Sequence, residues 1–202
     1  SETASTPTRG HGRKMDKRTI TGKKAKSRMK IMHAAKYLCE KNGIENVTFH
    51  DIAKEADVCR TTVFNHFSTT DQLMIALFCQ EIEDIDQYCS EINCSGMALI
   101  EAVFDKLIED TAYYPVLTYK IASSTILRGG VEDNSLIYIE KMIAENLPAP
   151  YRQQAALYTV ATMGAYYGLV NHYHSLNKTF DADQMKEEFH QLLELIFGGR
   201  EQ

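Results

Sequence analysis

Apolar residues recur with helical spacing along most of this chain, and this limits the fold more than any other feature. The first stripe comprises Ile31, Ala34, Ala35 and Leu38, at the i, i+3, i+4, i+7 positions of an amphipathic helix. No segment alternates apolar and polar residues between hairpin turns, as strands usually do. The sequence therefore predicts an all-α protein of about nine helices.

Stop and start signals divide the first part of this pattern into short helices. Gly43 follows the first stripe and can adopt the left-handed conformation common at helix ends. Thr48 then offers an N-cap hydroxyl, and Asp51 places a carboxylate in the next first turn, where the helix dipole favours it. The buried side of this second helix is predicted to comprise Ile52, Ala53 and Ala56.

A third short helix is predicted after a tight turn at Asp57. Either Cys59 or Thr61 could cap its start. Its apolar anchors are Val63, Phe64 and Phe67. Two short helices joined by a tight turn form a helix-turn-helix, here over residues 48–67, whose second helix can enter the major groove of DNA.

Six more helices are predicted in the rest of the chain. They cover approximately residues 71–90, 96–114, 115–128, 136–147, 151–175 and 182–197. The helix at 151–175 carries a mostly apolar run from Ala155 to Val170, so it must be buried, either within one subunit or between two.

Charge is distributed unevenly along the sequence. Residues 1–70 contain 14 Lys and Arg against 7 Asp and Glu, whereas residues 71–202 contain 8 against 20. Such asymmetry indicates an N-terminal part that binds a polyanion and a solvated acidic body. Residues 1–24 lack apolar periodicity and are expected to form a disordered basic arm, which either only solubilises the chain or adds contacts to phosphates or to the minor groove.

Several other classes of protein are disfavoured. No apolar run reaches the roughly 20 residues of a membrane span, and no secretory signal is visible, so we expect a cytoplasmic protein. Five cysteines without a CxxC pair suggest neither a disulfide framework nor a zinc site. His172 and His174 lie two residues apart and face different sides of a helix. We therefore expect no metal, no cofactor and no enzymatic activity; a helical-bundle enzyme would need a metal or carboxylate cluster in the body.

Between residues 26 and 74, the order and spacing of residues resemble the DNA-binding domain of the tetracycline-repressor (TetR) family. The matching positions are Arg28–Ile31, Leu38, Gly43, Thr48, Asp51–Ala53, Ala56, Val58, Thr62–Phe67 and Leu73. The resemblance implies a homodimeric repressor that releases DNA when a small molecule enters its C-terminal domain. It also implies three segments: an arm (1–24), a helix-turn-helix domain (25–70) and a helical ligand-binding and dimerisation domain (71–202).

Candidate DNA contacts follow from side-chain chemistry and from this resemblance. Arg60 is the main candidate for reading a base, because a guanidinium can bond guanine O6 and N7 together. Thr61 or Thr62 could meet a thymine methyl or a phosphate, and residues at the start of the second helix are expected to meet phosphates. The full set comprises Thr48, His50, Arg60, Thr61, Thr62, Phe64, Asn65, His66 and Thr70.

Three residues depart from the family pattern. Asp57 occupies the turn where the family usually has Gly, and Asp is among the few residues that tolerate positive φ. Phe64 replaces a common Tyr and so lacks a hydroxyl for phosphate. Thr70 replaces a frequent Lys, although it could still cap the fourth helix. These changes predict weaker phosphate contact from the motif, which the basic arm could offset.

The body is expected to dimerise and to bind an effector. The last two helices of two subunits would form the interface, and a two-fold dimer would read a near-palindromic operator. Five side chains are candidates for lining an effector pocket, although they could equally fill the core. They are Tyr119, Tyr138, Met163, Tyr166 and Tyr167. The charge of the effector stays open. An activator or a ligand-independent partner-binding module is the alternative to a repressor.

Overall fold

A computed structural model describes residues 17–123 and 135–198 of the chain. These residues form nine α-helices and two short 3-10 helices, without a strand, which confirms the all-α class. The α-helices are α1 (Lys17–Asn42), α2 (Phe49–Glu55), α3 (Arg60–His66), α4 (Thr70–Glu91), α5 (Met97–Tyr113), α6 (Pro115–Ser123), α8 (Ser135–Asn146), α9 (Ala155–Ser175) and α10 (Ala182–Phe197). The 3-10 helices are η1 (Ile44–Asn46) and η2 (Ala149–Gln154).

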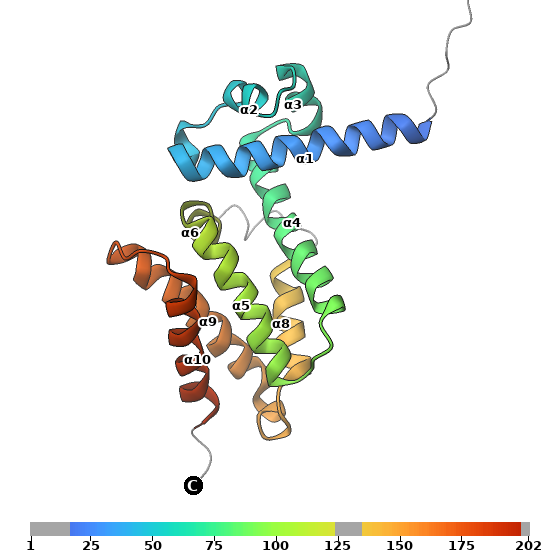
Figure 1. Cartoon of the computed structure of the whole chain (residues 1–202). Helices are drawn as coiled ribbons and strands as arrows, with labels where there is room; N and C mark the ends of the chain where they lie inside the picture. Colours follow the sequence, from blue (N-terminus) through green and yellow to red (C-terminus); the bar gives the residue numbers. More distant parts are fainter. Residues whose placement is uncertain (1–16, 124–134, 199–202) are drawn as a thin grey trace, which may run out of the picture.

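The N-terminal helices enclose a core of their own. Helices α2 and α3 lie on one side of α1, and the remaining helices lie on the other side (Figure 1). The predicted stripe of α1 is buried against Ile52 and Val63. Leu73 and Leu77 of α4 and Leu117 of α6 complete the same cluster. This core therefore extends beyond the helix-turn-helix into two helices of the body.

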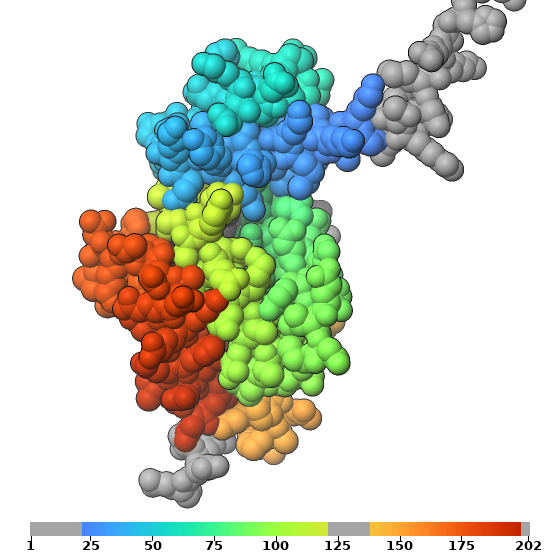
Figure 2. Space-filling view, in the orientation of Figure 1, coloured from blue at the N-terminus to red at the C-terminus, as the bar shows by residue number. Residues whose placement is uncertain are grey.

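A second and larger core holds the body together. Helix α5 contacts α4, α6, α8 and α10, and α9 packs against α8 and α10. The Phe104 ring of α5 lies 4.8 Å from Phe189 of α10 and 5.8 Å from Tyr166 of α9, between ring centroids. In space-filling view, the N-terminal helices form a distinct lobe above this body (Figure 2).

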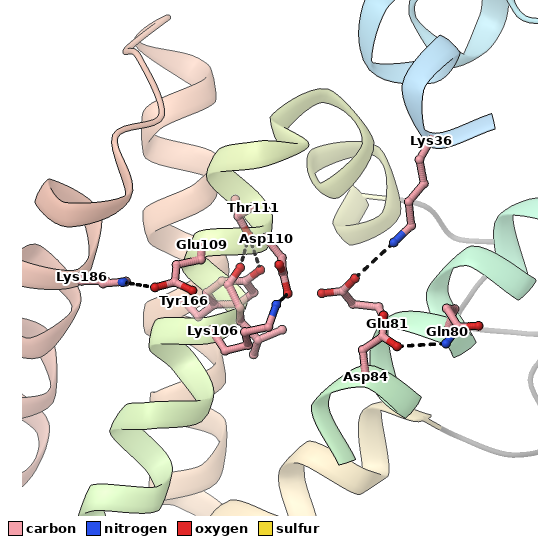
Figure 3. A network of polar contacts seen from close by, with 11 residues as sticks. Lys36, Gln80, Glu81, Asp84, Lys106, Glu109, Asp110, Thr111, Tyr166 and Lys186 are labelled. Atoms are coloured by element: carbon pink, nitrogen blue, oxygen red, sulfur yellow. Dashed lines mark hydrogen bonds and ion pairs between the residues drawn. The ribbon is translucent and has the colours of Figure 1, made fainter. Parts of the chain in front are cut away.

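Polar contacts join the two parts where α1 meets α4 and α6. Lys36 of α1 forms an ion pair of 3.7 Å with Glu81 of α4 (Figure 3). Glu40 accepts hydrogen bonds from the first amides of α6, including that of Leu117 at 3.2 Å. The α6 N-terminus thus has a carboxylate cap supplied by α1, which suits the positive end of a helix dipole.

The starts of two helices differ by several residues from those predicted. Helix α1 begins at Lys17, so residues 17–24 are helical although we expected them in a disordered arm. Four of these eight residues are Lys or Arg, which favour helix even without apolar periodicity. Helix α9 begins at Ala155 rather than Tyr151, because residues 149–154 form η2 after Pro148. Residues 1–16 of the predicted arm and the end of the predicted sixth helix lie outside the described residues.

No helix among the described residues is both long enough and apolar enough to cross a membrane.

Candidate nucleic-acid interface

The start of α2 is fixed by a reciprocal pair of side-chain to backbone contacts. The Asp51 amide donates to the Thr48 hydroxyl at 3.3 Å, and the Thr48 amide donates to the Asp51 carboxylate at 3.0 Å. This capping box confirms the predicted N-cap. The bonds from Thr48 lower the pKa of Asp51 below its usual value. Thr48 and His50 are exposed at this helix end, where a phosphate could approach.

The turn between α2 and α3 depends on one residue with positive φ. Asp57 has φ +53°, as its place in the turn predicts. The amide of the next residue, Val58, donates to the Ala53 carbonyl at 3.0 Å and closes the turn. Two short helices are thereby held in a defined crossing, and Ala53 and Ala56 are buried in the N-terminal core.

Two buried residues fix α3 on the lobe. Val63 is fully buried, and Phe67 at the C-terminal end is 2% exposed. Cys59 occupies the N-cap position, so of the two predicted candidates it is the one at the boundary, but its side chain bonds no backbone amide. Its thiol instead contacts the Thr62 hydroxyl at 2.9 Å, and this bond lowers the thiol's pKa.

The outward side of α3 carries most of the residues expected to meet DNA bases. Arg60, Thr61 and Asn65 are exposed there, and Thr62 is half-buried. The Arg60 guanidinium lies 5.3 Å from the centre of the Phe64 ring. This cation–π contact holds the arginine near the helix while its donors stay accessible.

Phe64 is not the buried anchor that the sequence predicted. It is 44% exposed and packs edge-on against Phe49 at 5.1 Å between ring centroids. Val63 and Phe67 already fill the inner face of this short helix, so the residue after Val63 turns outward by about 100°. Its ring supports Arg60 instead of filling the core.

The last two candidate residues lie at the far end of the motif. His66 is half-buried, and its Nε2 lies 2.8 Å from the Ser27 hydroxyl of α1. Burial, followed by the nearby charges of Arg28 and Lys24, lowers the pKa of His66. Thr70 is exposed but does not cap α4, contrary to the prediction. The cap is Thr69, whose extended backbone lets its hydroxyl accept from the Gln72 amide at 3.2 Å.

The five candidate ligand residues do not share one environment. Met163 and Tyr166 are buried in the body core, and Tyr138 and Tyr167 pack against that core. The Tyr166 hydroxyl shares a 2.7 Å hydrogen bond with Thr111 (Figure 3). Tyr119 of α6 stacks instead on the His174 ring, with 3.5 Å between ring centroids.

Comparison with known proteins supports the assignment of the N-terminal lobe. Residues 31–77 match the family model described as bacterial regulatory proteins of the TetR family. A search of curated protein sequences finds no significant match.

Solved structures share the fold at low sequence identity. The regulator FadR from Bacillus subtilis, in complex with stearoyl-CoA, is 19% identical, with a TM-score of 0.63 over 85% of this chain and 98% of its own. A regulator of the TerR/AcrR family from Aquifex aeolicus is 17% identical, with a TM-score of 0.65 over 85% and 99%. FadR from Thermus thermophilus, in complex with lauroyl-CoA, is 19% identical, with a TM-score of 0.54 over 86% and 94%. The N-terminal lobe therefore contains a DNA-binding domain of the TetR family, in a chain that shares its overall fold with these solved regulators.

Proposed function

We propose that this regulator is a repressor that binds its operator in sequence-specific fashion through α3. The observation that carries this proposal is the build of α3: one face is anchored by Val63 and Phe67, and the other presents Arg60, Thr61 and Asn65 to solvent. A short, rigid helix with polar side chains on its free face suits the major groove. Such a protein would act in the cytoplasm, beside the chromosome.

The candidate contacts divide into two kinds in this proposal. Arg60 reads a base, and Asn65 or a threonine adds contacts to base edges. Phosphate contacts come from the residues at the ends of the helices: Thr48, His50, Thr62, His66 and Thr70. Phe64 acts through Arg60, because its ring lies beneath the guanidinium. Phosphate contacts position the protein, whereas base contacts discriminate between sequences.

Replacing Arg60 tests this division. Arg60→Ala should reduce the preference for operator over random DNA by roughly 10- to 100-fold, since a bidentate base contact contributes about 1–3 kcal/mol. Arg60→Lys keeps the charge but lacks the planar fork, so it should lose much of the same preference. The measurement is a competition binding assay, with Lys41→Ala as the control that removes one charge from the same lobe. Equal loss of affinity for operator and random DNA in both Arg60 variants would contradict base reading.

We further propose that two copies associate through α9 and α10. Helix α9 contains no Lys, Arg, Asp or Glu, yet Leu157 and Val160 on it are 67% and 66% exposed. Gly164 and Gly168 follow on the same side, and no described atom lies within 4 Å of a Cβ placed on either. An uncharged, open helix face of this kind suits close packing against a second copy.

A small amphipathic effector is the third part of the proposal. Thr159 and Thr162 are buried on α9, and their hydroxyls have no hydrogen-bond partner among the described residues. Each such hydroxyl costs about 1–3 kcal/mol, which a polar group of a ligand would offset. Met163 and Tyr166 lie on the same helix face by their spacing. Because two structural neighbours are complexes with acyl-CoA, acyl-CoA thioesters are the first compounds to titrate against the protein–DNA complex, with release of DNA as the expected result.

A further inference from the structure

Helix α1 extends past the end of α3, and its N-terminal end projects beyond the lobe (Figures 1 and 2). Residues 22–26 are all exposed. From residue 22 onward, the first buried residue of the helix is Ile31. The exposed turns are therefore not needed to complete the core.

Two contacts fix this extension relative to α3. Ser27 meets His66 at 2.8 Å between the hydroxyl and Nε2. One residue further, the Arg28 guanidinium lies 4.5 Å from the centre of the Phe67 ring. Both partners stand at the C-terminal end of α3, so the extension is a rigid continuation of the helix-turn-helix surface.

The extension is strongly basic, and it lies at the N-terminal end of α1, where the helix dipole is also positive. Residues 22–30 contain five Lys or Arg and no acidic residue, and the first turn of α1 has no acidic residue either. Positive side chains near a helix N-terminus are disfavoured by the helix dipole and by mutual repulsion. This charge distribution does not favour the isolated helix, but a polyanion alongside it would offset both effects.

One face of the extension points toward the side of α1 on which α2 and α3 lie. Lys24, Arg28, Ile31 and Ala35 follow one another at intervals of three or four residues, and Ile31 and Ala35 are buried under the helix-turn-helix. Lys24 therefore faces away from the body, beyond the end of α3. Lys26 lies about 200° around the helix from Lys24 and faces the other way.

We propose that Lys24, Ser27 and Arg28, here termed the basic shoulder, contact the phosphate backbone of duplex DNA beside the bases that α3 reads. The proposal rests on α3 as the DNA-reading helix. Charge complementarity and continuity with α3 both favour DNA as the occupant of this surface. In each half of the operator, the contacted DNA would then extend beyond the bases under α3, and this added stretch would be bound without preference for its sequence.

Lys24→Gln and Lys26→Gln form a matched pair for testing this, because both remove one exposed charge from the same helix. The slope of log affinity against log salt concentration should fall by about 0.9 for each phosphate that a substitution leaves without its cation. We expect that fall in Lys24→Gln, an unchanged slope in Lys26→Gln, and a fall of about 1.8 when Lys24 and Arg28 are both replaced by Gln. The preference for operator over random DNA should not change in any variant.

Equal slopes in Lys24→Gln, Lys26→Gln and the parent protein would overturn the proposal that the basic shoulder contacts phosphates. Shortening the DNA supplies a second measurement: a duplex that ends at the bases under α3 should abolish the difference between the two variants. Retention of the difference on this short duplex would also contradict the proposal. If the parent protein showed no preference for any sequence, the proposed repressor function would fail. The salt slopes measured on random DNA would still show whether the basic shoulder contacts phosphates.

Discussion

At the scale of single residues, the helix-turn-helix departs from its family at points that the structure accommodates. Asp57 takes the left-handed conformation at φ +53°, which costs a non-glycine residue about 1–2 kcal/mol. The exposed Phe64 replaces a hydroxyl-bearing ring and supports Arg60 through its π face. The motif thus keeps its geometry with one hydroxyl fewer, and the proposed phosphate contacts from α1 would offset that loss.

Asp57→Gly should raise the free energy of unfolding by up to about 1 kcal/mol, because glycine adopts this φ without steric cost. Asp57→Val should lower it by more than that, since a β-branched residue is strained there. Urea unfolding followed by circular dichroism provides both values. Equal stability of the two variants would mean that the turn does not depend on this conformation.

At the scale of elements, the junction of α1, α4 and α5 contains a carboxyl group with an unusual affinity for protons. Glu81 of α4 lies between Lys36 and the Lys106–Asp110 ion pair of α5 (Figure 3). Burial, and then the neighbouring Asp110 carboxylate, raise the pKa of Glu81 to about 7, against the opposing effect of the two lysines. The Glu81 carboxyl, at the contact between the lobe and the body, therefore binds a proton more tightly in the folded protein than in the unfolded chain.

Glu81 makes stability depend on pH in a predictable direction. The stability conferred by its protonated form is present in full below its usual pKa of 4.5 and is lost as pH rises through about 7. Glu81→Gln imitates the protonated form, so it should match the parent near pH 5 and be more stable by about 1–2 kcal/mol near pH 8. The control is Glu83→Gln, which changes an exposed residue of the same helix. A constant difference between Glu81→Gln and the parent from pH 5 to 8 would contradict this account.

The same scale shows what sequence patterns can and cannot predict. The N-cap at Thr48 and the buried stripe of α1 were predictable, because they depend on neighbours in the sequence. The role of Leu117 in the N-terminal core was not, since it depends on how α6 folds back onto α1. The exposed position of Phe64 follows from competition among three apolar residues on one short helix, which spacing alone does not resolve. The basic shoulder could have been found by extending the stripe of Ile31 backward to Lys24.

At the scale of the whole molecule, the proposed function requires two copies with a defined separation of their α3 helices. One α3 of seven residues reads few base pairs, whereas a two-fold dimer can read two half-sites about 34–36 Å apart. An effector bound in the body would act by favouring a different separation, to the extent that it binds that arrangement more tightly.

The dimer proposal predicts that charges on the open face of α9 separate the subunits. Leu157→Lys with Val160→Lys should raise the dimer dissociation constant at least about 100-fold, because burial of each apolar side chain contributes roughly 1.5–3 kcal/mol. Tyr113→Lys is the control, since Tyr113 is 73% exposed on α5. Sedimentation equilibrium measures the change, and a parent protein that is monomeric at micromolar concentration would refute the interface.

Selection of bound sequences from random duplex DNA by the purified protein tests the central claim most directly. The account predicts enrichment of one near-palindromic sequence whose half-sites lie one helical turn apart, with a guanine at a fixed position in each half. The same selection with Arg60→Ala should lose preference at that guanine while keeping the spacing. Recovery of unenriched DNA by the parent protein, or enrichment that does not depend on Arg60, would contradict DNA reading by α3.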